Sequence, residues 1–256
     1  MESALFLFAH PDDEFGVYHC LELERRRGRR IRCAYLTDGG AGVASPDKRL
    51  RESVAVLRRY GVLPQDVAFP GRELGIPDGG LPEHLAKVGA WIDGHLTQHD
   101  KPLAIYVPAW EGGHHDHDGL HAVALTVLQK HGLLESTLQF SLYHSKGCRA
   151  PWFKVLAPLA ANGETHILSI PWRSRFRYVF DCLRYPSQWR SWIGLFPFAA
   201  WHYLARGTQS LQPVSPARGT ARPHDGPLYY EQRKFYTWER MQEQLARYAA
   251  SDRPSP

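Results

Sequence analysis

The sequence has few cysteines, and none of them is spaced like a redox or metal-binding pair. Among the 256 residues, four cysteines are widely scattered and never form a C-x-x-C motif: Cys20, Cys33, Cys148 and Cys182. A chain of this length can bury most of its apolar surface without disulfides. We therefore interpret these side chains as buried or incidental thiols in a reducing compartment.

Long apolar runs and a leader sequence are also lacking. No stretch of about 18 or more apolar residues occurs, so we expect no segment that spans a bilayer. The first three residues carry no positive charge, and the apolar stretch 4–9 that follows is too short for a signal peptide. These absences predict a cytoplasmic protein.

Several common motifs are missing as well. No G-x-G-x-x-G follows the first apolar run, which ends at His10 and Pro11, and this argues against a nucleotide-binding protein. No G-x-S-x-G occurs, and no cysteine lies in the two histidine motifs described below, which argues against a serine or cysteine hydrolase. No basic run is interleaved with base-stacking motifs, so nucleic acid is not an expected partner.

The composition is that of an ordinary globular protein. The hydrophobic share of 43% and the charged share of 22% indicate one soluble domain of generous size, or one domain with an appendage. The formal net charge of +5 is mildly basic. It suits an acidic substrate or a membrane surface, but ordinary surface lysines and arginines explain it equally well.

Strand and helix patterns alternate along the first 130 residues. Short apolar runs predict strands at 4–9, 31–36, 67–69 and 103–107, and helical spacing of apolar residues predicts helices at 14–27, 47–60, 81–96 and 119–130. This alternation predicts an α/β fold with a largely parallel sheet. Ligands of such sheets bind at the carboxyl ends of the strands.

After about residue 145 the pattern loosens. Segment 173–206 is rich in aromatic and basic residues, and two interpretations remain open. It is either a helical subdomain that packs its tryptophans inside or an interfacial surface with aromatics and arginines at membrane headgroup level. Segment 212–227 is rich in proline and glycine and predicts a loop. The sequence does not say whether this loop closes over a pocket. Segment 229–249 predicts a closing helix.

A first cluster of metal-binding side chains directly follows the first predicted strand. The sequence Ala-His-Pro-Asp-Asp-Glu at 9–14 places His10, Asp12 and Asp13 at the mouth of the sheet. Imidazole and carboxylate groups are good ligands for zinc and similar ions. One carboxylate can bind the metal while the other accepts a proton from water. The alternative is a turn that caps the following helix through Asp13.

A second cluster, 112–118, follows the strand at 103–107. Two glycines precede His114, His115, Asp116 and His117. This segment supplies a further imidazole ligand, and a second histidine able to stabilise the oxyanion of a tetrahedral intermediate. Alone, such a segment is often a solvated loop. Because both clusters lie at strand ends of one sheet, we favour a shared metal-dependent hydrolytic site.

Residues 9–14 together with the His-x-Asp-His of 114–117 resemble the signature of the PIG-L/LmbE-like de-N-acetylases. That family includes GlcNAc-phosphatidylinositol deacetylases and the deacetylases of the mycothiol and bacillithiol pathways. The resemblance covers about 4–145. It implies a Rossmann-like three-layer core at 1–145, followed by a C-terminal helical or irregular extension at 146–256. We expect that extension to pack on the core as one structural domain and to shape the substrate pocket.

The resemblance also implies roles for individual residues. The implied zinc ligands are His10, Asp13 and His117, the implied general base is Asp12, and the implied oxyanion-stabilising group is His114. Asp116 would orient a histidine, as metal sites generally require. Iron is the alternative metal, because histidine and aspartate bind it too.

Weaker matches lie between the two motifs. Thr-Asp-Gly-Gly at 37–40 resembles a strand-ending turn of the family, Arg49 lies in an R-x-x-E, and Asp78 lies in a D-G-x-L segment. The resemblance implies that Arg49 and Asp78 contact the substrate. The alternative is that Arg49 forms a surface salt bridge and that Asp78 is an ordinary turn residue. We assign His115 and His121 to solvent or packing.

The function that follows from the resemblance is hydrolysis of an amide. The expected substrate is an N-acetylated amino sugar or glycoconjugate. A non-sugar N-acyl natural product and a non-catalytic sugar-binding relative are the alternatives, and retention of all five site positions argues against the latter. Peripheral membrane contact and the oligomeric state stay open, since no motif matches beyond about residue 145.

Overall fold

Seven strands form the central sheet of the computed structural model, counted over the residues that it describes, 1–40 and 46–251. The strand order is β3-β2-β1-β4-β5-β9-β8. The strands are β1 (Ser3–Phe8), β2 (Arg30–Tyr35), β3 (Val67–Ala68), β4 (Ala104–Pro108), β5 (Thr137–Phe140), β8 (His166–Ser169) and β9 (Thr208–Pro213). The first five in the order are parallel, and β9 and β8 extend the sheet in antiparallel pairs. A separate hairpin joins β6 (Tyr143–His144) to β7 (Lys154–Val155).

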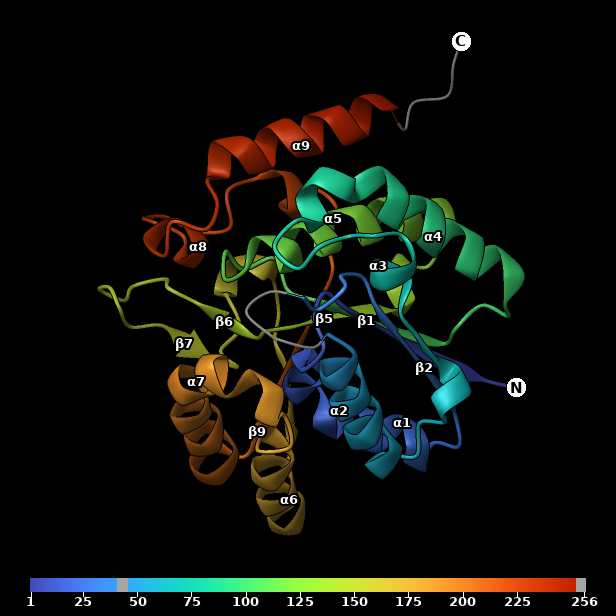
Figure 1. The fold of residues 1–256 in the computed structure, drawn as a ribbon, viewed down its shortest axis with the longest axis vertical. Coiled ribbons are helices and arrows are strands. Elements are labelled where there is room, and N and C mark those ends of the chain that lie inside the picture. Colours follow the sequence, from blue (N-terminus) through green and yellow to red (C-terminus); the bar gives the residue numbers. More distant parts are fainter. Residues whose placement is uncertain (41–45, 252–256) are drawn as a thin grey trace.

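Helices cover both faces of this sheet, and successive side chains of β1 point alternately to one face and the other. Phe6 and Phe8 enter one apolar core, and Leu5 and Leu7 enter the other. One layer contains α1 (Tyr18–Arg26), α2 (Pro46–Arg59), α6 (Trp172–Cys182) and α7 (Trp189–Trp201). The other contains α4 (Leu85–Gln98), α5 (His115–Lys130) and α9 (Trp238–Ser251), with the short α3 (Pro70–Glu73) nearby (Figure 1). The predicted three-layer α/β fold with a largely parallel sheet is confirmed.

Some element boundaries differ from the expectation. The helix expected at 14–27 begins only at Tyr18, after a 3₁₀ turn (Asp13–Gly16), and the one expected at 81–96 opens with a 3₁₀ turn (Leu81–His84). The helix expected from residue 119 begins at His115. Its start is earlier because the side chain of His114 accepts the backbone N–H of Asp116 and caps the first turn.

The C-terminal part differs more. The expected helix 229–249 is two helices, α8 (Tyr229–Gln232) and α9, because the backbone takes a left-handed conformation at Lys234. Segment 212–227 begins within β9 and contains a 3₁₀ turn (Arg218–Thr220). The expectation that tryptophans of 173–206 pack inside is wrong for Trp189 and Trp201, which are exposed, while Trp192 is buried.

The described helices are all too short or too polar to cross a lipid bilayer.

Candidate metal centre

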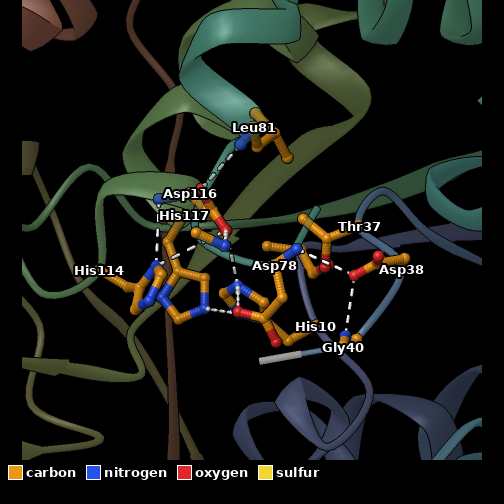
Figure 2. Close-up of polar contacts among 12 residues, drawn as sticks. His10, Thr37, Asp38, Gly40, Asp78, Leu81, His114, Asp116 and His117 are labelled. Carbon is orange, nitrogen blue, oxygen red and sulfur yellow. Dashed lines mark hydrogen bonds and ion pairs between the residues drawn. The ribbon is translucent and has the colours of Figure 1, made fainter. Parts of the chain in front are cut away.

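The two histidine motifs meet because the strands before them are neighbours. β1 pairs with β2 on one side and with β4 on the other, so the strand order reverses between β1 and β4. Parallel sheets bind ligands beyond the carboxyl ends of the strands at such a reversal. Figure 2 shows His10 from the first motif together with His114 and His117 from the second at this position.

His10, Asp13 and His117 bring three potential ligand atoms into one buried cluster. His10 Nδ1 lies 3.2 Å from His117 Nε2, and His117 Nε2 lies 3.0 Å from Asp13 Oδ1. His10 Nδ1 lies 3.7 Å from Asp13 Oδ2, which accepts a 2.8 Å hydrogen bond from the His10 backbone N–H. These ligand atoms all lie within 4.8 Å of one another. Two imidazoles and a carboxylate are a common ligand set of catalytic zinc sites.

Asp116 fixes the orientation of His10. Its Oδ2 lies 2.9 Å from His10 Nε2 and accepts the Gly79 N–H at 2.7 Å, while Oδ1 accepts the Leu81 N–H at 3.0 Å (Figure 2). A proton on His10 Nε2 satisfies this contact, so the Nδ1 lone pair points toward His117 and Asp13. Metal-binding histidines commonly have such a carboxylate behind them.

The electrostatics of this cluster favour a cation. Two imidazole nitrogens and a carboxylate oxygen at such distances need a positively charged group among them, which is either a proton or a metal ion. Burial lowers the pKa of His10, but Asp78, Asp116 and Asp13 outweigh it and raise that pKa well above its usual value. Burial raises the pKa of Asp13, yet His117 and His10 hold it well below its usual range. The residues therefore fit a divalent metal ion.

Asp12 lies between two of these residues in the chain and has a strained backbone. Its φ of 103° is rare for a residue with a side chain, and such strain concentrates at functional sites. Its N–H donates to Glu14 Oε2 at 3.0 Å, and its Oδ1 lies 3.5 Å from Arg49 Nη2. Burial raises the pKa of Asp12 to about 8, against the opposing effect of Arg49. Arg49 is therefore the group that most favours the ionised form of this carboxyl, and burial opposes it.

Arg49 and Asp78 pair with each other inside the site. Arg49 Nη1 lies 2.5 Å from Asp78 Oδ2 and 3.1 Å from the Gly39 carbonyl oxygen, and Nε donates to the Pro11 carbonyl at 3.1 Å. Both side chains are more than nine-tenths buried, so the interpretation of Arg49 as a surface salt bridge is wrong. Arg49, on α2, thereby connects the loops after β1, β2 and α3.

His114 is held as a neutral ring beside the cluster. Its Nδ1 accepts the Asp116 backbone N–H at 3.1 Å, so the proton lies on Nε2. Its ring lies between His10 and His115, with centroid distances of 4.5 and 4.4 Å. Burial and the neighbouring His115 and His10 lower the pKa of His114 well below its usual value. Its Nε2–H is therefore available to donate to a bound oxygen atom.

The two remaining histidines of this region bond to backbone carbonyl groups. His115 lies 2.8 Å from the Gly79 carbonyl oxygen through Nε2 and stacks on Tyr236 with ring centroids 4.5 Å apart. His121 donates from Nδ1 to the Pro108 carbonyl at 2.8 Å and is fully buried. Neither belongs to the cluster of His10, Asp13 and His117.

Residues far along the chain also hold the first motif, and sequence reasoning missed them. Tyr185 donates to Glu14 Oε1 at 2.8 Å, and Gln188 Nε2 donates to the Pro11 carbonyl at 2.7 Å. Both lie in the connection between α6 and α7, more than 170 positions from their partners. Glu14 is the last residue of the first motif, but no local pattern in the sequence marks Tyr185 or Gln188.

An aromatic wall borders the centre on the side of the β6–β7 hairpin. The Tyr143 ring lies 5.7 Å from that of His117 and within 6.1 Å of Phe153 and Tyr229. A cavity of about 510 Å³ lies beyond Phe153, against α7, and contains none of His10, Asp13 or His117. Phe153 thus belongs both to the wall and to the lining of this cavity.

Comparison with known protein families gives one match. The model of the family described as PIG-L, GlcNAc-PI de-N-acetylase, matches residues 5–128, which contain both histidine motifs together with Arg49 and Asp78. A sequence comparison with curated proteins gives no match.

Solved structures share the fold at low sequence identity. The conserved protein TT1542 from Thermus thermophilus is 22% identical, with a TM-score of 0.58 over 84% of this chain and 95% of that one. The zinc-inhibited form of teicoplanin deacetylase is 16% identical, with a TM-score of 0.62 over 83% and 98%. The N,N'-diacetylchitobiose deacetylase from Pyrococcus horikoshii, complexed with its inhibitor, is 15% identical, with a TM-score of 0.58 over 84% of each chain.

Proposed function

Residues 5–128 belong to the PIG-L family of GlcNAc-PI de-N-acetylases, and from this premise we propose that the protein removes an N-acetyl group from an amino sugar or glycoconjugate. The observation that carries the proposal is the buried cluster of His10, Asp13 and His117 at the reversal point of the sheet. Deacetylases are also among the proteins that share the fold.

The proposed metal ligands are His10 Nδ1, His117 Nε2 and a carboxylate oxygen of Asp13. A divalent ion, zinc in the first instance and iron as the alternative, would activate water and polarise the amide carbonyl there. Asp116 keeps the His10 ring in the required tautomer. One protein of this fold is described as zinc-inhibited, so activity is to be tested at substoichiometric as well as excess zinc.

Asp12 is the proposed general base. Asp12 directly precedes Asp13 in the chain, and Arg49 Nη2 lies 3.5 Å from its Oδ1. From there Asp12 takes the proton of the attacking water and returns it to the leaving amine. The strained backbone at this residue fixes the direction of the carboxylate.

His114 is the proposed donor to the carbonyl oxygen. The backbone of Asp116 occupies Nδ1, so Nε2–H is the free donor, and the edge-on ring of His10 and the stacked ring of His115 keep it in place. A preorganised donor of this kind stabilises the negative charge that develops on the oxygen.

The substrate-binding edge is proposed to include Arg49 and Asp78, together with the aromatic wall of Tyr143, Phe153 and Tyr229. In this proposal the C-terminal region 146–256 shapes the pocket, since it supplies Phe153 and Tyr229 and also holds the first motif through Gln188. A non-sugar N-acyl natural product remains the second candidate substrate. The likeness to teicoplanin deacetylase favours including it.

The test is release of a free amine from a panel of N-acetylated compounds by the metal-loaded protein. We expect turnover of at least one N-acetylamino sugar or glycoconjugate, and its loss in Asp12→Asn. Turnover of acyl natural products alone would select the second candidate. Turnover of none, with one metal ion bound per chain, would contradict a hydrolytic function.

A further inference from the structure

Two neighbouring helices of the C-terminal part expose large apolar side chains. Seven of the thirteen exposed large hydrophobic residues in the described chain lie in 172–206 and are 51–68% exposed. We call them the α6–α7 outer face: Trp172, Phe176, Phe180, Leu183, Trp189, Ile193 and Trp201. The three on α6 recur every four residues, and Leu183 directly follows that helix. On α7, Trp189 and Ile193 are four residues apart, and Trp201 is the last residue of the helix. Residues four apart lie on the same side of a helix.

The inner side of the same helices is already occupied. Tyr178 and Trp192 are buried in the core that includes Phe8, and the Trp192 ring packs edge-on against Phe15 at 5.3 Å. A helix on the surface of a soluble protein normally has one apolar stripe, directed inward, and polar residues outside. These two helices have apolar residues on both sides, and contiguous exposed apolar surface marks an interaction site.

The charge of this segment has one sign. Segment 172–206 contains six arginines, no lysine and a single acidic residue, Asp181. Its net charge is therefore +5, equal to that of the whole chain, so the rest of the chain is balanced. Asp181 is fully buried and bonded to Arg59 and Tyr60. The outer face thus offers basic and aromatic groups with no exposed carboxylate.

Several of these arginines are free to meet an external anion. Arg173, Arg190 and Arg206 are exposed and have no acidic partner within residues 1–40 and 46–251. Arg190 lies over the Trp189 ring at 5.6 Å, and Arg175 lies over the Trp172 ring at 4.3 Å. Basic side chains beside exposed tryptophans suit the region where lipid headgroups meet acyl chains.

The cavity next to α7 adds cations at the edge of the outer face. It is lined by Lys146, Lys154 and Arg206 together with Phe198 and Trp201, and no carboxylate lines it. Neither lysine has an acidic partner in the part of the chain that the structure describes. An anionic headgroup would find three cations there, beside an exposed tryptophan.

We propose that the α6–α7 outer face binds the surface of an anionic lipid bilayer. The aromatic and aliphatic side chains enter the headgroup boundary, and the arginines contact lipid phosphates. A second copy of this chain is a poor occupant, because a symmetric contact would bring two arginine-rich surfaces together without carboxylates to pair them. The inference concerns this surface and does not depend on the proposed function.

The position of the face gives the contact a structural consequence. The connection between α6 and α7 carries Tyr185 and Gln188, which hold the motif after β1. In Figure 1 the two helices lie at the opposite end of the molecule from α9. A protein bound through this face would therefore have the connection that holds the motif after β1 on the lipid side, and α9 directed away from the lipid.

The test is flotation of the full-length protein with vesicles of phosphatidylcholine alone or with phosphatidylglycerol added. We expect flotation with the anionic vesicles and little with the neutral ones. Arg173→Gln/Arg190→Gln should weaken binding to anionic vesicles about 30-fold. Phe176→Gln/Ile193→Gln should weaken it about tenfold or more, since it removes two groups that leave water on binding.

Matched controls remove the same groups elsewhere. Arg233→Gln/Arg247→Gln changes the charge equally, directly after α8 and on α9, and Phe235→Gln/Leu103→Gln removes apolar groups of similar exposure. Both controls should float like wild type, with unchanged circular dichroism in all variants. Absence of wild-type flotation, or equal losses in the controls, would overturn the proposal. A dimer by light scattering that Phe176→Gln/Ile193→Gln converts to monomer would also overturn it, because a second copy would then cover the face.

Discussion

Replacing Asp116 by asparagine should weaken metal binding without unfolding the protein. Asp116 accepts three hydrogen bonds, from His10 Nε2, Gly79 N–H and Leu81 N–H. An asparagine offers one oxygen and one NH₂ group in the same space, so at least one of these donors must face another donor. An unsatisfied buried donor costs about 1–3 kcal/mol.

Part of this loss falls on the metal site. The contact to His10 is weakened most, because it is the one in which the charge of Asp116 matters. A neutral amide no longer favours the His10 ring that carries its proton on Nε2. Loss of such a carboxylate behind a metal-binding histidine weakens metal affinity about 10–100-fold. The assay is a competition titration of the metal against a chromophoric chelator, with thermal unfolding recorded in parallel.

Asp118→Asn is the matched control on the same helix. Asp118 is equally buried, but only its Oδ1 is used, by the N–H groups of Glu111 and Gly112. Burial also raises the pKa of Asp118 to about 7, so a neutral side chain is already accessible there. The control should keep wild-type metal affinity. Equal affinity in Asp116→Asn and wild type, or an equal loss in Asp118→Asn, would refute the assigned role of Asp116.

Three further predictions concern catalysis and stability. Asp12→Asn should lower kcat about 100–10,000-fold while metal content by elemental analysis stays at the wild-type level; unchanged kcat would remove Asp12 as the base. Burial lowers the pKa of His121 to about 4 from 6.5, so the unfolded chain takes up this proton first and stability falls between pH 6.5 and 4. On acidification through that range, the unfolding free energy of His121→Gln should therefore fall by up to about 3 kcal/mol less than that of wild type, as measured by urea unfolding. The same dependence of unfolding free energy on pH in both proteins would contradict this. Tyr185→Phe leaves Glu14 without its 2.8 Å donor and should lower the unfolding free energy by about 1–3 kcal/mol, and a wild-type urea midpoint would show that this bond does not stabilise the loop.

The sequence predicts the parallel part of the sheet and the meeting of the two histidine motifs, because both depend on local patterns. A continuous apolar run marks β1, and a histidine-aspartate motif stands at its end. β1 and β4 are neighbours in a parallel sheet, which brings the loops behind them together without any further information. The placement of His10 beside His117 follows from these two facts.

Contacts between distant elements could not be predicted in the same way. Arg49 and Asp78 each lie in a motif, but only the folded loops reveal that they pair with each other in a buried position. Tyr185 and Gln188 hold the first motif from the C-terminal part, and no local pattern in the sequence predicts these contacts. The start of α5 at His115 depends on capping by a histidine side chain, which ordinary cap preferences do not include.

The aromatic residues of α6 and α7 illustrate a limit of periodicity. Apolar residues occur on both sides of these helices, so the sequence pattern cannot tell which side meets the core. In the structure Trp192 is buried and Trp189 is exposed. The charge of the exposed side then indicates which kind of partner it binds.

The most direct test of the metal centre is elemental analysis of the purified protein. Wild type is compared with His10→Ala/His117→Ala and with the control His95→Ala/His99→Ala, which removes another neighbouring histidine pair whose rings lie 4.4 Å apart. We predict about one zinc or iron ion per chain in wild type and control, and its loss in His10→Ala/His117→Ala. Retention of the metal in that variant, or its absence from wild type after zinc is supplied, would contradict the account.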